Sequence, residues 1–198
     1  MIFVVTGPSG SGKSTILRCV FKDLRGVAFS VSHTTRPPRE SERNGREYHF
    51  VDEAEFKRMI GRQAFVEWAV VHGHYYGTSK AEIAAKSRGA DVLLDIDVQG
   101  ARQVREHFRE AIFIFILPPK FAELKRRLRD RGEDDPATIG LRLKNAKREI
   151  REYKDFEYVL INDRLDRAVL ELEAIILGAR CRTRVRRRAI RAVLDSFR

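Results

Sequence analysis

A glycine-rich segment, residues 7–15, has the residue types needed to wrap a polyphosphate. Residues 7–14 read GPSGSGKS and match the pattern G-x-x-x-x-G-K-[ST]. Glycine lets the backbone approach phosphate oxygens closely, so that backbone N–H groups can donate to them. Lys13 would neutralise the β and γ oxygens, and the Ser14 hydroxyl would be a ligand of Mg²⁺. We therefore predict a nucleoside triphosphate site at Gly7, Pro8, Ser9, Gly10, Ser11, Gly12, Lys13, Ser14 and Thr15.

A second segment, residues 32–50, carries donors suited to a phosphate monoester. Arg36 and Arg39 stand three positions apart beside hydroxyl-bearing residues, and Tyr48 adds a further donor. A guanidinium group can hold a phosphate through two parallel hydrogen bonds. The segment therefore predicts a site for a fixed monophosphate, and a solvated basic loop is the alternative interpretation of the same residues.

Two carboxylates, Asp95 and Asp97, end an apolar run that begins at Asp91. If residues 91–97 form a buried strand, these two side chains point to the same face, toward the crevice where α/β sheets bind ligands. Two carboxylates in such a crevice favour a cation or a ligand rich in donors. We expect Asp95 to serve the Mg²⁺ and phosphate side, through water, and Asp97 to serve the nucleoside side.

Apolar runs and turn residues predict alternating strands and helices that would position these groups. The run 3–6 precedes the glycine-rich loop, and a helix and a second strand follow it, which is how an α/β fold begins. Residues 111–117 are almost continuously apolar and end at Pro118, as in a central parallel strand. The predicted helices are 13–23, 53–60, 80–87, 100–108, 121–131, one beginning after Asp135, and 165–178, and the predicted strands are 3–6, 27–31, 91–97, 111–117 and 158–161.

Composition limits the class of protein. The chain has 198 residues, of which 43% are hydrophobic, and this fits one domain with a real core. No apolar run reaches the length of about eighteen residues that a membrane span needs, so we expect no membrane partner. Cys19 and Cys181 have no metal-ligand spacing, which favours a reducing, cytoplasmic location.

The chain is strongly basic. Its formal net charge is +11, which implies attraction for an anionic partner such as a nucleotide, a nucleic acid or a membrane surface. Much of the excess comes from seven arginines between Arg180 and Arg191. A solvated C-terminal helix is the favoured interpretation of this stretch. Binding of nucleic acid is the alternative, which the lack of aromatic residues between the arginines makes weaker.

These motifs occur together in one protein family. Residues 34–51 resemble the signature of guanylate kinases, and residues 95–100, which read DIDVQG, are similar to that family's second motif. The resemblance covers essentially residues 1–178, and shorter stretches that also correspond are 65–68, 75–77 and the turn at Arg131 and Gly132. It implies an enzyme of purine nucleotide metabolism and GMP recycling that transfers the γ-phosphoryl group of ATP to GMP, and also to dGMP, with Mg²⁺ as cofactor.

The resemblance also implies how the acceptor nucleotide is bound. In guanylate kinases the positions that match Arg36, Arg39, Tyr48 and Tyr76 bind the phosphate of GMP. Guanine is bound at the positions that match Ser32, Glu67, Thr78 and Asp97. The choice of Glu67 makes chemical sense, because one carboxylate can accept from both N1–H and the 2-amino group of guanine. Adenine cannot offer that pair, since its N1 is itself an acceptor.

Further residues are implied for the ATP side and for catalysis. Arginines of a closing lid would spread the charge of the transferred group and exclude water. They match Arg127, Arg131 and Arg142, of which Arg142 would also reach GMP, and Asn162 would lie near ATP. The expected catalytic set is Lys13, Arg36, Asp95, Arg131 and Arg142, with Ser14 and Asp95 on the metal.

The fold implied is an α/β P-loop three-layer fold with a parallel central sheet, an inserted mixed α+β GMP-binding subdomain and a helical lid. The expected bounds are 1–32, 82–120 and 147–198 for the core, 33–81 for the subdomain and 121–146 for the lid. A scaffolding domain that binds peptides in the monophosphate cleft is one alternative, which the intact glycine-rich loop disfavours. A kinase for another acceptor is a second alternative, disfavoured by the complete guanine-side set, and a homo-oligomer stays open.

Overall fold

Five parallel strands form the central sheet of the computed structural model, which describes residues 1–71, 73–130 and 135–198. Their spatial order is β2-β7-β1-β8-β9, so that β8 lies inside the sheet, as its apolar sequence predicts. The parallel central sheet of the predicted fold is therefore confirmed. The strand bounds are Ile2–Thr6 for β1, Val27–Phe29 for β2, Asp91–Asp95 for β7, Ile112–Leu117 for β8 and Tyr158–Ile161 for β9.

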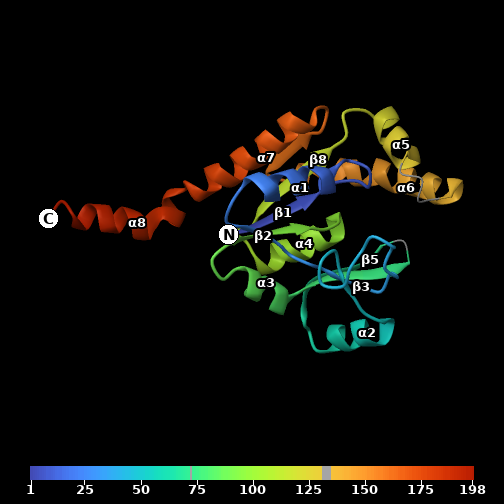
Figure 1. Cartoon of the computed structure of the whole chain (residues 1–198), viewed down its shortest axis with the longest axis horizontal. Coiled ribbons are helices and arrows are strands. Elements are labelled where there is room, and N and C mark those ends of the chain that lie inside the picture. Colours follow the sequence, from blue (N-terminus) through green and yellow to red (C-terminus); the bar gives the residue numbers. More distant parts are fainter. Residues whose placement is uncertain (72, 131–134) are drawn as a thin grey trace.

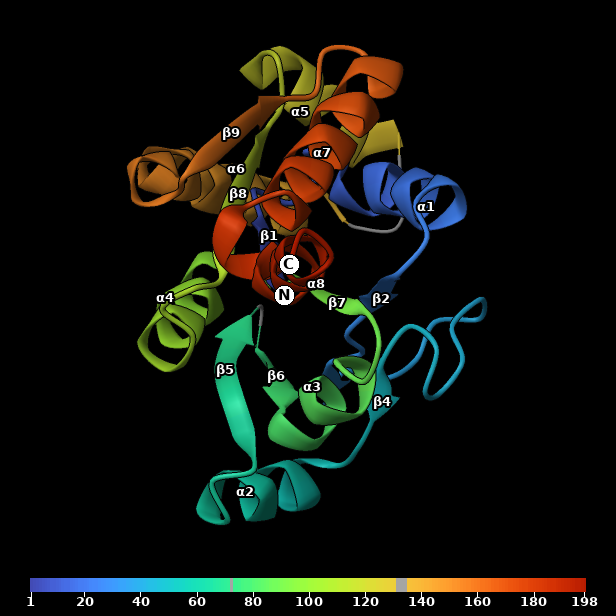
Figure 2. The same ribbon diagram turned by 90° about the vertical axis from the view of Figure 1, so that its left-hand side faces the viewer.

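Helices cover both faces of this sheet and complete three layers (Figures 1 and 2). On one face, α1 (Lys13–Asp23) and α7 (Leu165–Arg180) bury side chains such as Val20 and Leu172 against β1 and β8. On the other face, α3 (Lys80–Lys86) and α4 (Val98–His107) enclose a second apolar cluster. The central sheet therefore lies between two apolar cores.

A second, mixed sheet follows β2 and forms a separate layer beside α3 and α4 (Figure 2). Its order is β4-β3-β6-β5, with antiparallel pairing of β3 and β5 to β6 and parallel pairing of β3 to β4. Helix α2 (Glu53–Gly61) is capped by Asp52 and stacks Phe56 on Phe65 with ring centroids 4.5 Å apart. The strands are β3 (His33–Thr34), β4 (His49–Phe50), β5 (Phe65–Val71) and β6 (His74–Ser79).

Two further helices, α5 (Phe121–Asp130) and α6 (Pro136–Glu149), pack on each other beyond the end of β8 (Figure 1). They share a small apolar cluster of Leu124, Leu128 and Ala146. Asp135 caps α6 and Pro136 is its first residue, as predicted. A 3₁₀ helix, residues Ile150–Asp155, then leads to β9.

The C-terminal arginine-rich stretch forms a helix, α8 (Thr183–Asp195), that projects away from the rest of the molecule (Figure 1). All of its residues are exposed, in agreement with the favoured interpretation of this stretch. Arg184 forms an ion pair with Glu110 at 2.9 Å, which ties the start of the helix to the domain. In the described part of the chain, no helix is long and apolar enough to cross a membrane.

One predicted boundary is wrong at the binding edge of the sheet. The strand expected over 91–97 ends at Asp95, and the helix expected from residue 100 already begins at Val98. Asp97 is the N-cap of that helix and accepts a hydrogen bond from the Gly100 N–H at 2.8 Å. Aspartate is among the best N-caps, so the backbone turns into a helix where the apolar pattern alone predicts more strand. Asp95 and Asp97 therefore belong to different elements.

Candidate active site

The glycine-rich loop connects β1 to α1 and has the backbone that its pattern predicts. Gly12 is the N-cap of α1 in a left-handed conformation, with φ of 94°. Lys13 is the first residue of the helix, and its ammonium turns back over the loop to donate to the Gly7 carbonyl at 2.5 Å. The Pro8 carbonyl lies 3.5 Å from the same nitrogen. The loop thus forms a cradle with a positive charge at its rim.

Packing inside the protein gives two of these glycines an additional role. A methyl group at Gly7 would lie 2.2 Å from the backbone oxygen of Ile116 in β8. At Gly12 it would lie 2.2 Å from Nδ2 of Asn162, just beyond β9. The sequence predicts that glycine is needed here so that phosphate can approach the backbone closely. The structure adds a second reason for glycine, which is the close approach of Ile116 and Asn162 near the ends of neighbouring strands.

Asn162 and Arg127 hold the loop from behind. The buried Asn162 amide donates to the Ser11 carbonyl at 2.7 Å. Arg127, on α5, donates to the same carbonyl at 3.2 Å, to the Asn162 carbonyl at 3.2 Å and to Glu123 at 2.8 Å. Arg142, on α6, lies 3.5 Å from the Ser9 hydroxyl. Three of the residues predicted for the ATP side therefore surround the loop, and Arg131 lies outside the described residues.

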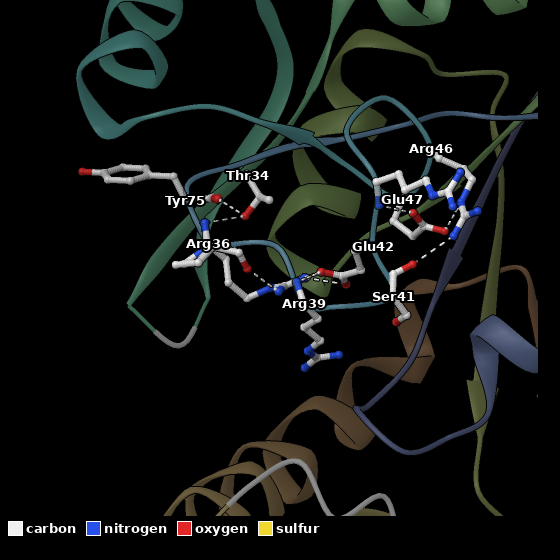
Figure 3. A network of polar contacts seen from close by, with 10 residues as sticks. Thr34, Arg36, Arg39, Ser41, Glu42, Arg46, Glu47 and Tyr75 are labelled. Carbon is white, nitrogen blue, oxygen red and sulfur yellow. Dashed lines mark hydrogen bonds and ion pairs between the residues drawn. The ribbon is translucent and has the colours of Figure 1, made fainter.

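The predicted monophosphate segment folds around an arginine–glutamate pair. Arg36 donates through Nη2 to both carboxylate oxygens of Glu42, at 2.7 and 2.8 Å, and through Nη1 to the Pro37 carbonyl at 2.7 Å. Glu42 also accepts from the Arg39 N–H at 2.8 Å. Arg36 lies along the loop toward Glu42, whereas the Arg39 side chain extends away from the loop (Figure 3). The Arg36 guanidinium is thus held in place by Glu42 and by the Pro37 carbonyl.

Two tyrosines complete this half of the site. The Arg36 guanidinium lies 5.5 Å from the ring centre of Tyr48, whose ring is 5.8 Å from that of Tyr76. Burial, together with the nearby Asp95 carboxylate, raises the pKa of Tyr48 to about 12. Tyr48 therefore keeps its proton at neutral pH and remains a hydrogen-bond donor.

A buried carboxylate lies on the second sheet. Glu67, on β5, is only 3% exposed and stands opposite Thr78 of β6. Thr78 in turn lies 3.2 Å, oxygen to oxygen, from the Ser32 hydroxyl. Burial raises the pKa of Glu67 to about 7; the neighbouring Asp97 charge adds to this, and hydrogen bonding from Thr78 opposes it. The structure thus brings together four residues predicted for guanine from four separate segments.

Asp95 lies between the two halves. It ends β7, directly beside Val5 of β1, and its carboxylate is close enough to contribute to the raised pKa of Tyr48. Burial raises the pKa of Asp95, and the Lys13 ammonium counteracts this. The Asp95 carboxylate therefore interacts electrostatically with Lys13 of the triphosphate loop and with Tyr48 of the monophosphate segment.

Two acidic residues near the site were not among the predicted ones. Glu42 orients Arg36, and its place three residues after Arg39 was the only signal for it in the sequence. Glu149, at the end of α6, is half-buried near Lys13 and Asp97, and burial raises its pKa. It stands seven residues after Arg142, on the same face of the helix, but only the fold brings that face to the loop.

Known proteins share this architecture. A family model described as guanylate kinase matches residues 1–179. Guanylate kinase of Dechloromonas aromatica (strain RCB) is 53% identical over 176 residues, covering 88% of this chain and 87% of that protein. Guanylate kinase of Geobacter sulfurreducens (strain ATCC 51573 / DSM 12127 / PCA) is 43% identical over 198 residues, covering 100% and 96%. The crystal structure of guanylate kinase from Anaplasma phagocytophilum superimposes with a TM-score of 0.75 at 31% identity, covering 92% and 87%.

Proposed function

The chain belongs to the guanylate kinase family and transfers a phosphoryl group from ATP to GMP, and we propose that the two phosphate loops joined at Asp95 carry out this transfer. The observation that supports the assignment of residues is the position of Asp95 at the end of β7, next to β1, where its carboxylate interacts electrostatically with Lys13 of one loop and Tyr48 of the other. Donor and acceptor phosphates bound to the two loops would meet at this carboxylate. Such an arrangement converts a bimolecular reaction into one between positioned groups.

On the donor side, the backbone N–H groups of residues 7–15 bind the phosphates of ATP, and Lys13 neutralises the β and γ oxygens. Arg127 and Arg142 already contact the loop, so a small movement of α5 and α6 brings their charge to the transferred group. Arg131 belongs to the same proposal. Closure of these helices would also exclude water that could hydrolyse ATP.

The residues present fit a magnesium ion. The Ser14 hydroxyl follows Lys13 on α1, and the buried Asp95 carboxylate interacts electrostatically with Lys13, so these two side chains would supply oxygen ligands beside the phosphate cradle. Mg²⁺ prefers oxygen ligands and keeps several waters, and two protein oxygens leave room for them. When bound, the ion would add positive charge at the bridging phosphate oxygens.

On the acceptor side, Arg36, Arg39, Tyr48 and Tyr76 bind the phosphate of GMP. Glu67 accepts from N1–H and the 2-amino group of guanine, with Ser32, Thr78 and Asp97 around it, and Arg142 reaches the phosphate from the lid. The attacking atom is already a phosphate oxygen anion at neutral pH. The protein therefore positions the reactants and spreads charge without needing a strong general base.

We assign these roles to three parts of the chain. The core comprises 1–32, 82–120 and 147–198, the GMP-binding subdomain 33–81, and the lid 121–146. The separate sheet with α2 and the separate apolar cluster of α5 and α6 support this division. The free thiols of Cys19 and Cys181 support a reducing compartment, the cytoplasm.

Replacing Arg36 tests the acceptor site. We expect Arg36→Ala to raise KM for GMP by at least about tenfold and to leave KM for ATP nearly unchanged, because a charge-assisted contact to one substrate is lost. Arg46→Ala is the matched control, since Arg46 lies in the same loop but is exposed and pairs with Glu47. Steady-state kinetics with each substrate varied would measure both constants. Equal effects on ATP and GMP, or equal effects of the two variants, would contradict the assignment.

The pKa of Glu67 predicts a pH-dependent affinity for GMP. Below its pKa of about 7 the carboxyl is mostly protonated and cannot accept two hydrogen bonds; above it the carboxylate can. KM for GMP should therefore fall as the pH rises from about 6 to about 8. A phosphate monoester has its own second pKa near about 6, so Glu67→Gln serves as the control that keeps only that ionisation. Identical pH profiles for the wild type and Glu67→Gln would refute this prediction.

A further inference from the structure

Gly100 stands against the buried carboxylate of Glu67. It is a buried residue in the first turn of α4, where its N–H donates to Asp97 at 2.8 Å. A methyl group built on Gly100 would lie 2.5 Å from Oε2 of Glu67, 3.1 Å from its Cδ and 3.3 Å from Oδ1 of Asp97. The nearest neighbours of this position are thus the two carboxylates on the guanine side.

The atoms that such a methyl group meets are movable. At Gly7 a methyl group would collide with the backbone of Ile116, which cannot move without a large cost in free energy. At Gly100 it meets the end of a flexible side chain. Alanine also has a higher helix propensity than glycine, and Gly100 lies within a helix. The fold would therefore accept alanine at this position, and the Glu67 carboxylate would have to move.

We propose that Gly100 is a specificity-determining position, because its missing side chain leaves the space in which the Glu67 carboxylate faces guanine. This inference rests on the proposed role of Glu67. A carboxylate that accepts from two donors of one base needs both oxygens in the plane of that base. A displacement of about 1 Å is enough to lose this alignment. Adenine makes no such pair of contacts, so its binding should not depend on Gly100.

The Gly100→Ala variant separates the binding of guanine from stability. We expect KM for GMP to rise by about ten- to a hundredfold, while KM for ATP and the rate with AMP change little. The midpoint of thermal unfolding should not fall. Gly178→Ala is the matched control, because Gly178 is a helical glycine of α7 around which a methyl group would meet no atom within 4 Å. It should leave all kinetic constants unchanged.

A second variant tests whether the effect acts through Glu67. Glu67→Asp shortens the side chain and withdraws the carboxylate from Gly100, so it should cost less activity with GMP in the Gly100→Ala background than in the wild type. Three results would overturn the inference. They are additive losses of activity in the double variant, an unchanged KM for GMP in Gly100→Ala, and equal losses of activity with respect to GMP and ATP. If Glu67→Gln does not raise KM for GMP, the proposed guanine site itself is wrong. If Glu67→Gln raises KM for GMP but Gly100→Ala leaves it unchanged, only the inference about Gly100 is wrong.

Discussion

Replacing Lys13 with alanine is expected to lower kcat by about a thousandfold or more, with little effect on folding. The Lys13 ammonium lies at the rim of the phosphate cradle, held there by the carbonyls of Gly7 and Pro8. It is placed to neutralise charge that moves onto the β–γ bridging oxygen as the bond breaks. Its contacts in the free protein are to two loop carbonyls, so its removal takes away charge without opening the core.

A coupled assay of ADP release, together with circular dichroism of each variant, would measure this effect. Lys22→Ala is the matched control, because Lys22 lies in the last turn of the same helix and is exposed. The control should retain wild-type kcat. A folded Lys13→Ala variant that keeps more than about a tenth of the activity would show that this ammonium does not stabilise the transferred group.

Replacing Glu67 with glutamine is expected to lower kcat/KM for GMP by about a hundredfold or more. The amide can accept with one atom only, and its NH₂ group would face a donor of guanine, leaving buried donors unpaired. Glu67 is 3% exposed, so water cannot easily replace the lost contact. The activity with AMP should change far less, and the preference for GMP over AMP should therefore shrink.

Kinetics with GMP and AMP as alternative acceptors would measure that preference. Glu106→Gln, an exposed change of the same chemistry on α4, is the control and should behave like the wild type. An unchanged preference for GMP in Glu67→Gln would remove Glu67 from the guanine site and would direct attention to Ser32, Thr78 and Asp97.

Local patterns predict most of the fold because each element carries its own signal. The loop GPSGSGKS, the apolar run before Pro118 and the pair Asp135 and Pro136 all specify structure within a few residues. The strand boundary at Asp95 could not be predicted, because an apolar pattern does not reveal that Asp97 is more stable as an N-cap. Such a boundary depends on a competition between two local structures of similar stability.

Contacts between distant segments are what the sequence could not reveal. Asn162 was predicted to lie near ATP, and the fold brings its amide to the Ser11 carbonyl, 151 residues away. The positions of Glu149 near Lys13 and of Gly100 against Glu67 depend on how helices pack on the sheets. The same packing adds to the demand for glycine at Gly7 and Gly12. These long-range contacts surround the predicted site residues and fix their geometry.

Formation of nucleoside diphosphates from five acceptors tests the assigned reaction and its site most directly. Wild-type protein would be incubated with ATP and Mg²⁺ and with GMP, dGMP, AMP, UMP or CMP in turn, and the products would be separated by anion-exchange chromatography. We predict equal amounts of ADP and GDP with GMP, the corresponding pair with dGMP, and little product with the other three. Folded protein that binds ATP but forms no GDP, or that phosphorylates AMP as well as GMP, would contradict the assignment of the two loops and of Glu67.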